Sequence, residues 1–153
     1  MSDKSSQRLT ECMSDIGQPS SQRRALPPRH HHLTQKVKIA GQRILYFSIH
    51  DDEQLTEIFL RVKGSDCSSE LIGLYDVLAR LMSLALQYGA PHEKVGNLLT
   101  GVKFEPCGPV SGHHRLKHCT SLPDLIGRHL SVEYCSRNEL VHSQVSGQAE
   151  CGQ

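Results

Sequence analysis

Residues 68–88, SSELIGLYDVLARLMSLALQY, decide the fold of this chain. Small or polar residues recur in this stretch at spacings of three and four, and nearly everything between them is apolar. The pattern predicts a helix with one narrow polar stripe, packed over most of its circumference. Ser68 or Ser69 is the expected N-cap, and Gly89 is the expected stop. The stripe consists of Gly73, Asp76, Arg80, Ser83 and Gln87.

Three members of this stripe carry further expectations. Gly73 lowers the helix propensity by about 1 kcal/mol relative to alanine, which indicates close approach by another backbone. Asp76 and Arg80 lie four residues apart and are suited to an ion pair on a solvated edge. The alternative is that these two residues line a ligand cleft together with Gln87.

Before the helix, the apolar residues repeat every second position. Lys36–Ile39, Arg43–Ile49 and Thr56–Val62 are the expected strands. Turns are expected at residues 41–42 and 50–54. Such short connections favour antiparallel pairing, because a parallel pair needs a long crossover. The sequence therefore predicts a three-stranded antiparallel meander.

Two more helices are expected after the central one. Pro91 begins a short helix that runs to Leu99. The sequence Ser121-Leu-Pro-Asp124 marks the start of a last helix, over residues 121–134, with Ser121 as N-cap and Asp124 reaching back to the cap. The predicted fold class is α+β: a three-stranded antiparallel sheet packed on one face against the long central helix, with the second, C-terminal helix on its flank.

The composition predicts one domain, over residues 36–138, between two disordered segments. Residues 1–35 form a basic arm and residues 139–153 a flexible tail, because both are poor in apolar residues. A solvated arm is the simpler interpretation. The alternative is contact with nucleic acid through Arg23, Arg24 and Arg29. The three histidines at 30–32 are either loose metal ligands or part of the solvated arm.

The charge balance excludes a general electrostatic attraction to nucleic acid or to a membrane surface. The formal net charge is +1, from 17 basic and 16 acidic side chains. No stretch approaches the ~20 apolar residues that span a bilayer, and the first residues contain no secretory segment. We therefore expect a soluble, cytoplasmic protein whose six cysteines are reduced thiols or metal ligands.

Cysteines and histidines gather within 29 residues, from 107 to 135. A structural zinc site takes four such ligands, although the C-x₂-C pair of zinc knuckles is missing here. Reduced thiols in or near the core are the alternative. A cysteine hydrolase is not expected, because no Asn or Asp is placed to orient a base for Cys119. The candidate metal ligands are Cys107, His118, Cys119 and Cys135.

Several short segments resemble one known family, and they follow one another along the chain in the same order as in that family. Residues 120–124 read TSLPD, close to a Thr-Ser-Cys-Pro-Asp motif, with Leu122 in the place of Cys. The chain thus resembles the TSCPD domain in the C-terminal region of adenosylcobalamin-dependent (class II) ribonucleotide reductases, over about residues 26 to 138. The other segments are Leu26-Pro with Arg29 and Thr34-Gln-Lys, Ile39-Ala-Gly-Gln, Glu57-Ile-Phe, residues 81–91 (LMSLALQYGAP) and Lys103-Phe-Glu-Pro.

The resemblance implies an accessory or binding module in deoxynucleotide metabolism, without catalysis of its own. Class II enzymes react inside a large barrel that this chain lacks, so adenosylcobalamin would act only through a reductase partner. The family's tail often ends in a Cys-x-x-Cys pair, whereas the tail here contains only Cys151, which weakens a redox role. The expected partners are a ribonucleotide reductase or a nucleotide, and a second copy that pairs through a sheet edge or through helix 68–88. A small nucleic-acid-associated or zinc-stabilised interaction protein is the alternative.

Overall fold

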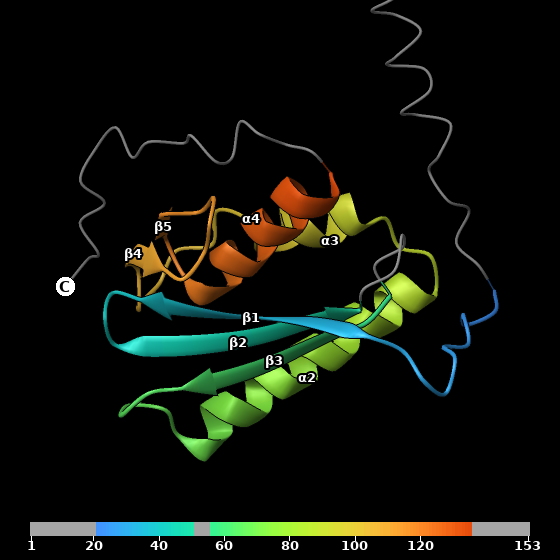
Figure 1. The fold of residues 1–153 in the computed structure, drawn as a ribbon, viewed down its shortest axis with the longest axis horizontal. Helices are drawn as coiled ribbons and strands as arrows, with labels where there is room; N and C mark the ends of the chain where they lie inside the picture. Colours follow the sequence, from blue (N-terminus) through green and yellow to red (C-terminus); the bar gives the residue numbers. More distant parts are fainter. Residues whose placement is uncertain (1–20, 51–55, 136–153) are drawn as a thin grey trace, which may run out of the picture.

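A computed structural model describes residues 21–50 and 56–135 (Figure 1). The described elements are the strands of one sheet and the helices that pack against it. Their bounds, in chain order, are β1 His32–Ile39, β2 Arg43–His50, β3 Ile58–Lys63, α2 Ser69–Gln87, α3 His92–Leu99, β4 Gly108–Ser111, β5 His118–Cys119 and α4 Leu122–Tyr134. The α+β class is therefore confirmed.

The sheet is larger than predicted. Within the described residues it has five strands in the order β3-β2-β1-β4-β5, and every neighbouring pair is antiparallel. The meander β1-β2-β3 is confirmed, but the prediction that the sheet stops at three strands is wrong. Strands β4 and β5 have four and two residues, too few to produce a recognisable alternation.

The first hairpin is closed by a turn with two left-handed residues. Ala40 has a φ of 50° and Gly41 a φ of 69°, and the Gln42 N–H donates to the Ile39 carbonyl over 3.0 Å. Positive φ at both central positions is the type I′ geometry, whose twist matches that of paired strands. This turn sets the register of β1 against β2.

One face of the meander is buried and carries the core. Phe47 of β2 packs edge-on against the ring of His129 in α4, while β3 packs against α2. Figure 1 shows α2 along β3, and α3 stacked with α4 on the side of β1. The opposite face of the sheet therefore has no helix over it among the described elements. The sheet residues of the core are Val37, Ile39, Leu45, Phe47, Ile49, Ile58, Leu60 and Val62.

The helix α2 begins at the predicted cap, where Ser68 Oγ accepts from the Leu71 N–H over 3.1 Å. Part of its polar stripe is exposed, where Asp76 and Arg80 form an ion pair, and part of it is buried. Ser83 is buried and its hydroxyl bonds both the N–H and the carbonyl of Ile58, at 2.9 and 3.1 Å. Gln87 is also buried and donates to the Thr56 carbonyl over 3.2 Å. These two side chains thus satisfy backbone groups at the start of β3.

The prediction that α2 is packed over most of its circumference is wrong for the single chain. The outward side of the helix exposes large apolar side chains at spacings of three and four, which we call the α2 seam. No described atom lies within 4 Å of a Cβ built on Gly73, so the close backbone approach expected there is absent from the described structure. The α2 seam consists of Leu74, Val77, Leu81, Leu84 and Tyr88, which are 42 to 60% exposed.

The helix α4 begins at Ser121, as predicted, with Ser121 Oγ accepting from the Asp124 N–H over 3.1 Å. The Asp124 carboxylate, however, does not reach back to Ser121 as predicted. It accepts from the Thr120 N–H at 3.0 Å and from the Gly101 N–H at 2.7 Å. Arg128 Nε also donates to Asp124, over 2.9 Å. The TSLPD segment therefore ties the start of α4 to the loop that follows α3.

The helices α3 and α4 cross at two glycines. A Cβ on Gly127 would lie 2.6 Å from the Gly96 carbonyl oxygen and 2.8 Å from the Thr100 amide nitrogen. Only glycine permits so close an approach of the two backbones. This contact fixes α3 on α4 as one unit above the sheet.

Candidate anion-binding surface

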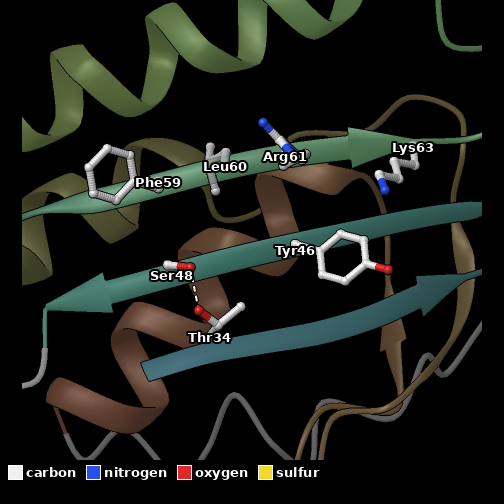
Figure 2. Close-up of a pocket in the computed structure, with 7 residues that line it drawn as sticks. All are labelled: Thr34, Tyr46, Ser48, Phe59, Leu60, Arg61 and Lys63. Atoms are coloured by element: carbon white, nitrogen blue, oxygen red, sulfur yellow. Dashed lines mark hydrogen bonds between the residues drawn. The ribbon is translucent and has the colours of Figure 1, made fainter. Parts of the chain in front are cut away.

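On the face of the meander that no described helix covers, nine side chains form a regular array. We call this array the open face. Strand alternation sends every second residue outward, and the register aligns these residues across β1, β2 and β3. Figure 2 shows Thr34 and Ser48 side by side on β1 and β2, and Tyr46 on β2 between the two neighbouring strands. The three rows are Thr34, Ser48 and Phe59; Lys36, Tyr46 and Arg61; and Lys38, Ile44 and Lys63.

The open face is strongly basic. Four of its nine positions carry a positive charge and none carries a carboxylate. The amino groups of Lys36 and Lys63 lie 5.7 and 5.5 Å from the centroid of the Tyr46 ring, on which they make cation–π contacts. A cluster of cations that forms no ion pair among the described residues attracts anions. The chain as a whole is nearly neutral, so this attraction is local.

A shallow hollow of about 360 Å³ lies on this face. Phe59 stands at its edge with half of its surface exposed, and Thr34 and Ser48 share a hydrogen bond of 2.6 Å across the strands. Exposed aromatic rings beside cations are suited to stack a base and to neutralise a phosphate. The lining residues are Thr34, Tyr46, Ser48, Phe59, Leu60, Arg61 and Lys63 (Figure 2).

The predicted metal ligands do not come together. Among the described residues, no three of Cys107, His118, Cys119 and Cys135 place ligand atoms within 4.8 Å of one another. Burial, assisted by the negative charge of Asp124, raises the pKa of the Cys119 thiol to about 12. This thiol keeps its proton at neutral pH and is a poor nucleophile. Cys107 is disulfide-bonded, so the expectation that every cysteine is a reduced thiol or a metal ligand is wrong for this residue. Zinc binding by the other candidates stays a prediction.

A different group, His113 with His129 and Glu133, does gather within 4.8 Å. His113 Nδ1 accepts from the backbone N–H groups of Arg115 and Leu116, at 3.1 and 2.9 Å. Its proton is therefore on Nε2, which donates to His129 Nδ1 over 2.9 Å. Both nitrogens that face each other are engaged in this hydrogen bond, so the pair makes a structural contact between α4 and the segment that precedes β5.

The basic arm contacts the end of α2. The Arg24 N–H donates to the Gln87 carbonyl over 2.9 Å, and Arg23 Nε donates to the Gln87 side chain over 2.5 Å. Arg29 is exposed. The part of the arm before residue 21 and the tail after residue 135 lie outside the described residues, as does Cys151. The predicted domain limits stay predictions.

Comparison with known proteins now decides the family. The family model for the TSCPD domain matches residues 18–134. The chain belongs to the TSCPD domain family. The TSLPD segment, whose Ser121 and Asp124 fix the start of α4, therefore has a structural role in this TSCPD domain.

Relatives of this TSCPD domain are vitamin B12-dependent ribonucleotide reductases. The protein from Bradyrhizobium diazoefficiens is 35% identical over 122 residues, which cover 79% of this chain and 10% of the relative. The one from Agrobacterium fabrum is 34% identical, over 83% of this chain and 10% of the relative. That from Rhodopirellula baltica is 30% identical, over 85% and 12%. The chain thus spans about a tenth of the length of these relatives. No solved structure matches it.

The sequence did not single out the open face. Its signal was present in the alternation of Lys36 and Lys38 with apolar residues, but the partners of these lysines on β3 become apparent only with the register.

No helix within the described ranges is long and apolar enough to cross a bilayer.

Proposed function

We propose that this TSCPD domain is a cytoplasmic, ribonucleotide-reductase-related binding module of deoxynucleotide metabolism that has no catalysis of its own. The open face carries the proposal, because its four cations and its aromatic rings suit the phosphates and the base of a nucleotide. The kinship with ribonucleotide reductases makes nucleoside di- and triphosphates the first ligands to test.

Adenosylcobalamin fits the described part of the chain poorly. A corrin cofactor needs an enclosing cavity much larger than the site of a drug-sized ligand, which takes roughly 300–1,000 Å³. The hollow on the open face is about 360 Å³ and open to solvent. The cofactor would therefore act through a reductase partner, and the proposed role of this chain includes no step through it.

Nucleoside triphosphate should raise the melting temperature of the chain by several degrees. Ligand at 100 times its dissociation constant stabilises a fold by about 2.7 kcal/mol. The double substitution Arg61→Gln with Lys63→Gln should weaken binding at least tenfold, because each cation makes a charge-assisted contact. Differential scanning fluorimetry at several salt concentrations measures both effects, and binding should weaken as salt rises.

The matched control replaces two exposed lysines outside the open face, Lys94→Gln with Lys103→Gln. It should bind nucleotide like the wild type. Absence of any thermal shift in the wild type, or equal loss in the control, would reject the nucleotide role. Binding that requires a single-stranded oligonucleotide would instead favour the nucleic-acid alternative, to which Arg29 of the arm can contribute.

The α2 seam supports a reductase as the protein partner. Contiguous exposed apolar side chains mark interaction sites. In the relatives, the matching tenth is joined to a much longer chain, which offers a surface to cover the seam. The 3-4 spacing of the seam also suits packing against a helix.

The substitution Leu81→Asp should abolish retention of the chain by a vitamin B12-dependent ribonucleotide reductase that lacks its own matching segment. A charge at a contact that excludes water costs several kcal/mol. Phe104→Asp, at an exposed apolar site outside α2, is the control and should be retained. Pull-down and analytical ultracentrifugation check the outcome. A stable dimer of wild-type chains that Leu81→Asp dissociates would show instead that a second copy covers the seam.

A further inference from the structure

Three potential metal ligands converge at one end of the open face. His30 Nε2 lies 3.0 Å and His32 Nε2 lies 3.4 Å from the same carboxylate oxygen, Glu57 Oε2. All three ligand atoms lie within 4.8 Å of one another. The side chains are about four-fifths buried, with 19 to 23% of their surface exposed, which limits competition from water.

The carbonyl of Pro27 orients the His30 ring toward Glu57. The carbonyl of Pro27 can only accept, and it lies 2.9 Å from His30 Nδ1, so this nitrogen carries the proton. In the neutral imidazole, Nε2 then has a bare lone pair, directed at a carboxylate oxygen of Glu57 3.0 Å away. Two acceptors at that distance repel each other unless a proton or a metal ion lies between them.

The contact of His30 with Glu57 has the length of a hydrogen bond, and the spacing of the three ligand atoms also accommodates a metal ion. Zinc ligands at about 2.0–2.2 Å in a tetrahedral arrangement lie roughly 3.3–3.5 Å from one another. The two nitrogen–oxygen distances, 3.0 and 3.4 Å, are close to that range. A metal-binding histidine characteristically donates its other N–H to a backbone carbonyl, which is what His30 does with Pro27.

We propose that His30, His32 and Glu57 bind a divalent transition-metal ion such as zinc. Two histidines and one glutamate form a ligand set that zinc uses when it keeps a fourth position open. The residues come from the segment before β1, from β1 itself and from the residue before β3. The site is distinct from the predicted group of Cys107, His118, Cys119 and Cys135.

His31 supplies a matched control for the proposed metal ligands. His30 and His32 are two residues apart and lie on one side of an extended segment, whereas His31 between them is exposed. Loose binding by the whole histidine tract would involve His31 as much as its neighbours. A defined site would not.

The test uses the full chain, stripped of metal with a chelator and titrated with zinc chloride alone in a calorimeter. We expect one equivalent to bind. His30→Ala, His32→Ala and Glu57→Gln should each weaken binding at least tenfold, and His31→Ala should bind like the wild type. The melting temperature of each variant without metal shows whether its fold is intact. Because no nucleotide is added, the result does not depend on the proposed ligand of the open face.

Cobalt(II) in place of zinc identifies the ligands. Nitrogen and oxygen ligands give visible d–d bands without the intense near-ultraviolet band of a thiolate ligand. A thiolate band would place the metal at the cysteines and overturn the proposal. So would the absence of stoichiometric binding, in which case the contact of His30 with Glu57 is an ion pair only. Equal loss in His31→Ala would show unspecific binding by the tract.

Discussion

Acidification from pH 6.5 to pH 4 should lower the free energy of unfolding by several kcal/mol. Burial, together with smaller contributions from the neighbouring His113 and His114, lowers the pKa of His129 to about 3. Burial also lowers the pKa of His113 to about 4, with smaller contributions from the positive charges of His114, Lys117 and Arg115. Both histidines are thus neutral in the folded chain at pH 6.5.

Acid destabilises the fold because the unfolded chain takes up protons that the folded chain does not bind. Unfolding returns each histidine to a pKa near 6.5, so the unfolded chain binds more protons below that pH. The stability that the neutral pair contributes is complete above pH 6.5, and it is lost as the pH falls toward 4 and then 3. Each unit of pKa difference corresponds to about 1.4 kcal/mol, so the two histidines together can remove much of the 5–15 kcal/mol typical of a domain.

Urea unfolding at a series of pH values measures this loss. The double substitution His113→Asn with His129→Gln keeps polar groups that do not titrate, and it should flatten the curve between pH 6.5 and 4. His31→Asn, at an exposed histidine, should leave the curve unchanged. If the double variant lost stability over this range as steeply as the wild type, carboxylates elsewhere would be the cause.

The local signals in the sequence correctly predicted the elements that satisfy their own ends. Ser68 and Ser121 cap their helices because a hydroxyl within reach of the first N–H groups needs no information from elsewhere in the chain. The Asp76–Arg80 ion pair was predicted for the same reason, and it is present. The α+β class followed from the change in period between the strands and residues 68–88.

Contacts between distant segments were not predictable in this way. Ser83 and Gln87 were assigned to the polar stripe, but they bond the backbone of Ile58 and Thr56. Periodicity in the sequence does not reveal such contacts. Likewise, His30 and Glu57 meet only because the meander brings the ends of β1 and β3 together. The α2 seam was read as core, because an apolar residue in a helix does not indicate whether a second element of the same chain covers it.

Replacing Asp124 with alanine should lower the free energy of unfolding by about 3–5 kcal/mol, a large part of the 5–15 kcal/mol typical of a domain. Asp124 is fully buried, and its carboxylate accepts from the backbone of Thr120 and Gly101 as well as from Arg128. The substitution removes the acceptor of two backbone N–H groups and leaves the largely buried Arg128 without this carboxylate. It also removes a negative charge from the first turn of α4.

Asp76→Ala is a closely matched control, because Asp76 and Arg80 form an ion pair of the same type and spacing on the exposed side of α2. Exposed pairs contribute about 0.3–0.5 kcal/mol, so this variant should melt within a degree or two of the wild type. Asp124→Asn keeps one acceptor oxygen and should fall between the two. Calorimetric melting of the three variants checks the order. Equal losses in Asp124→Ala and Asp76→Ala would mean that the TSLPD segment does not hold α4 in place and that the buried carboxylate is dispensable for the fold.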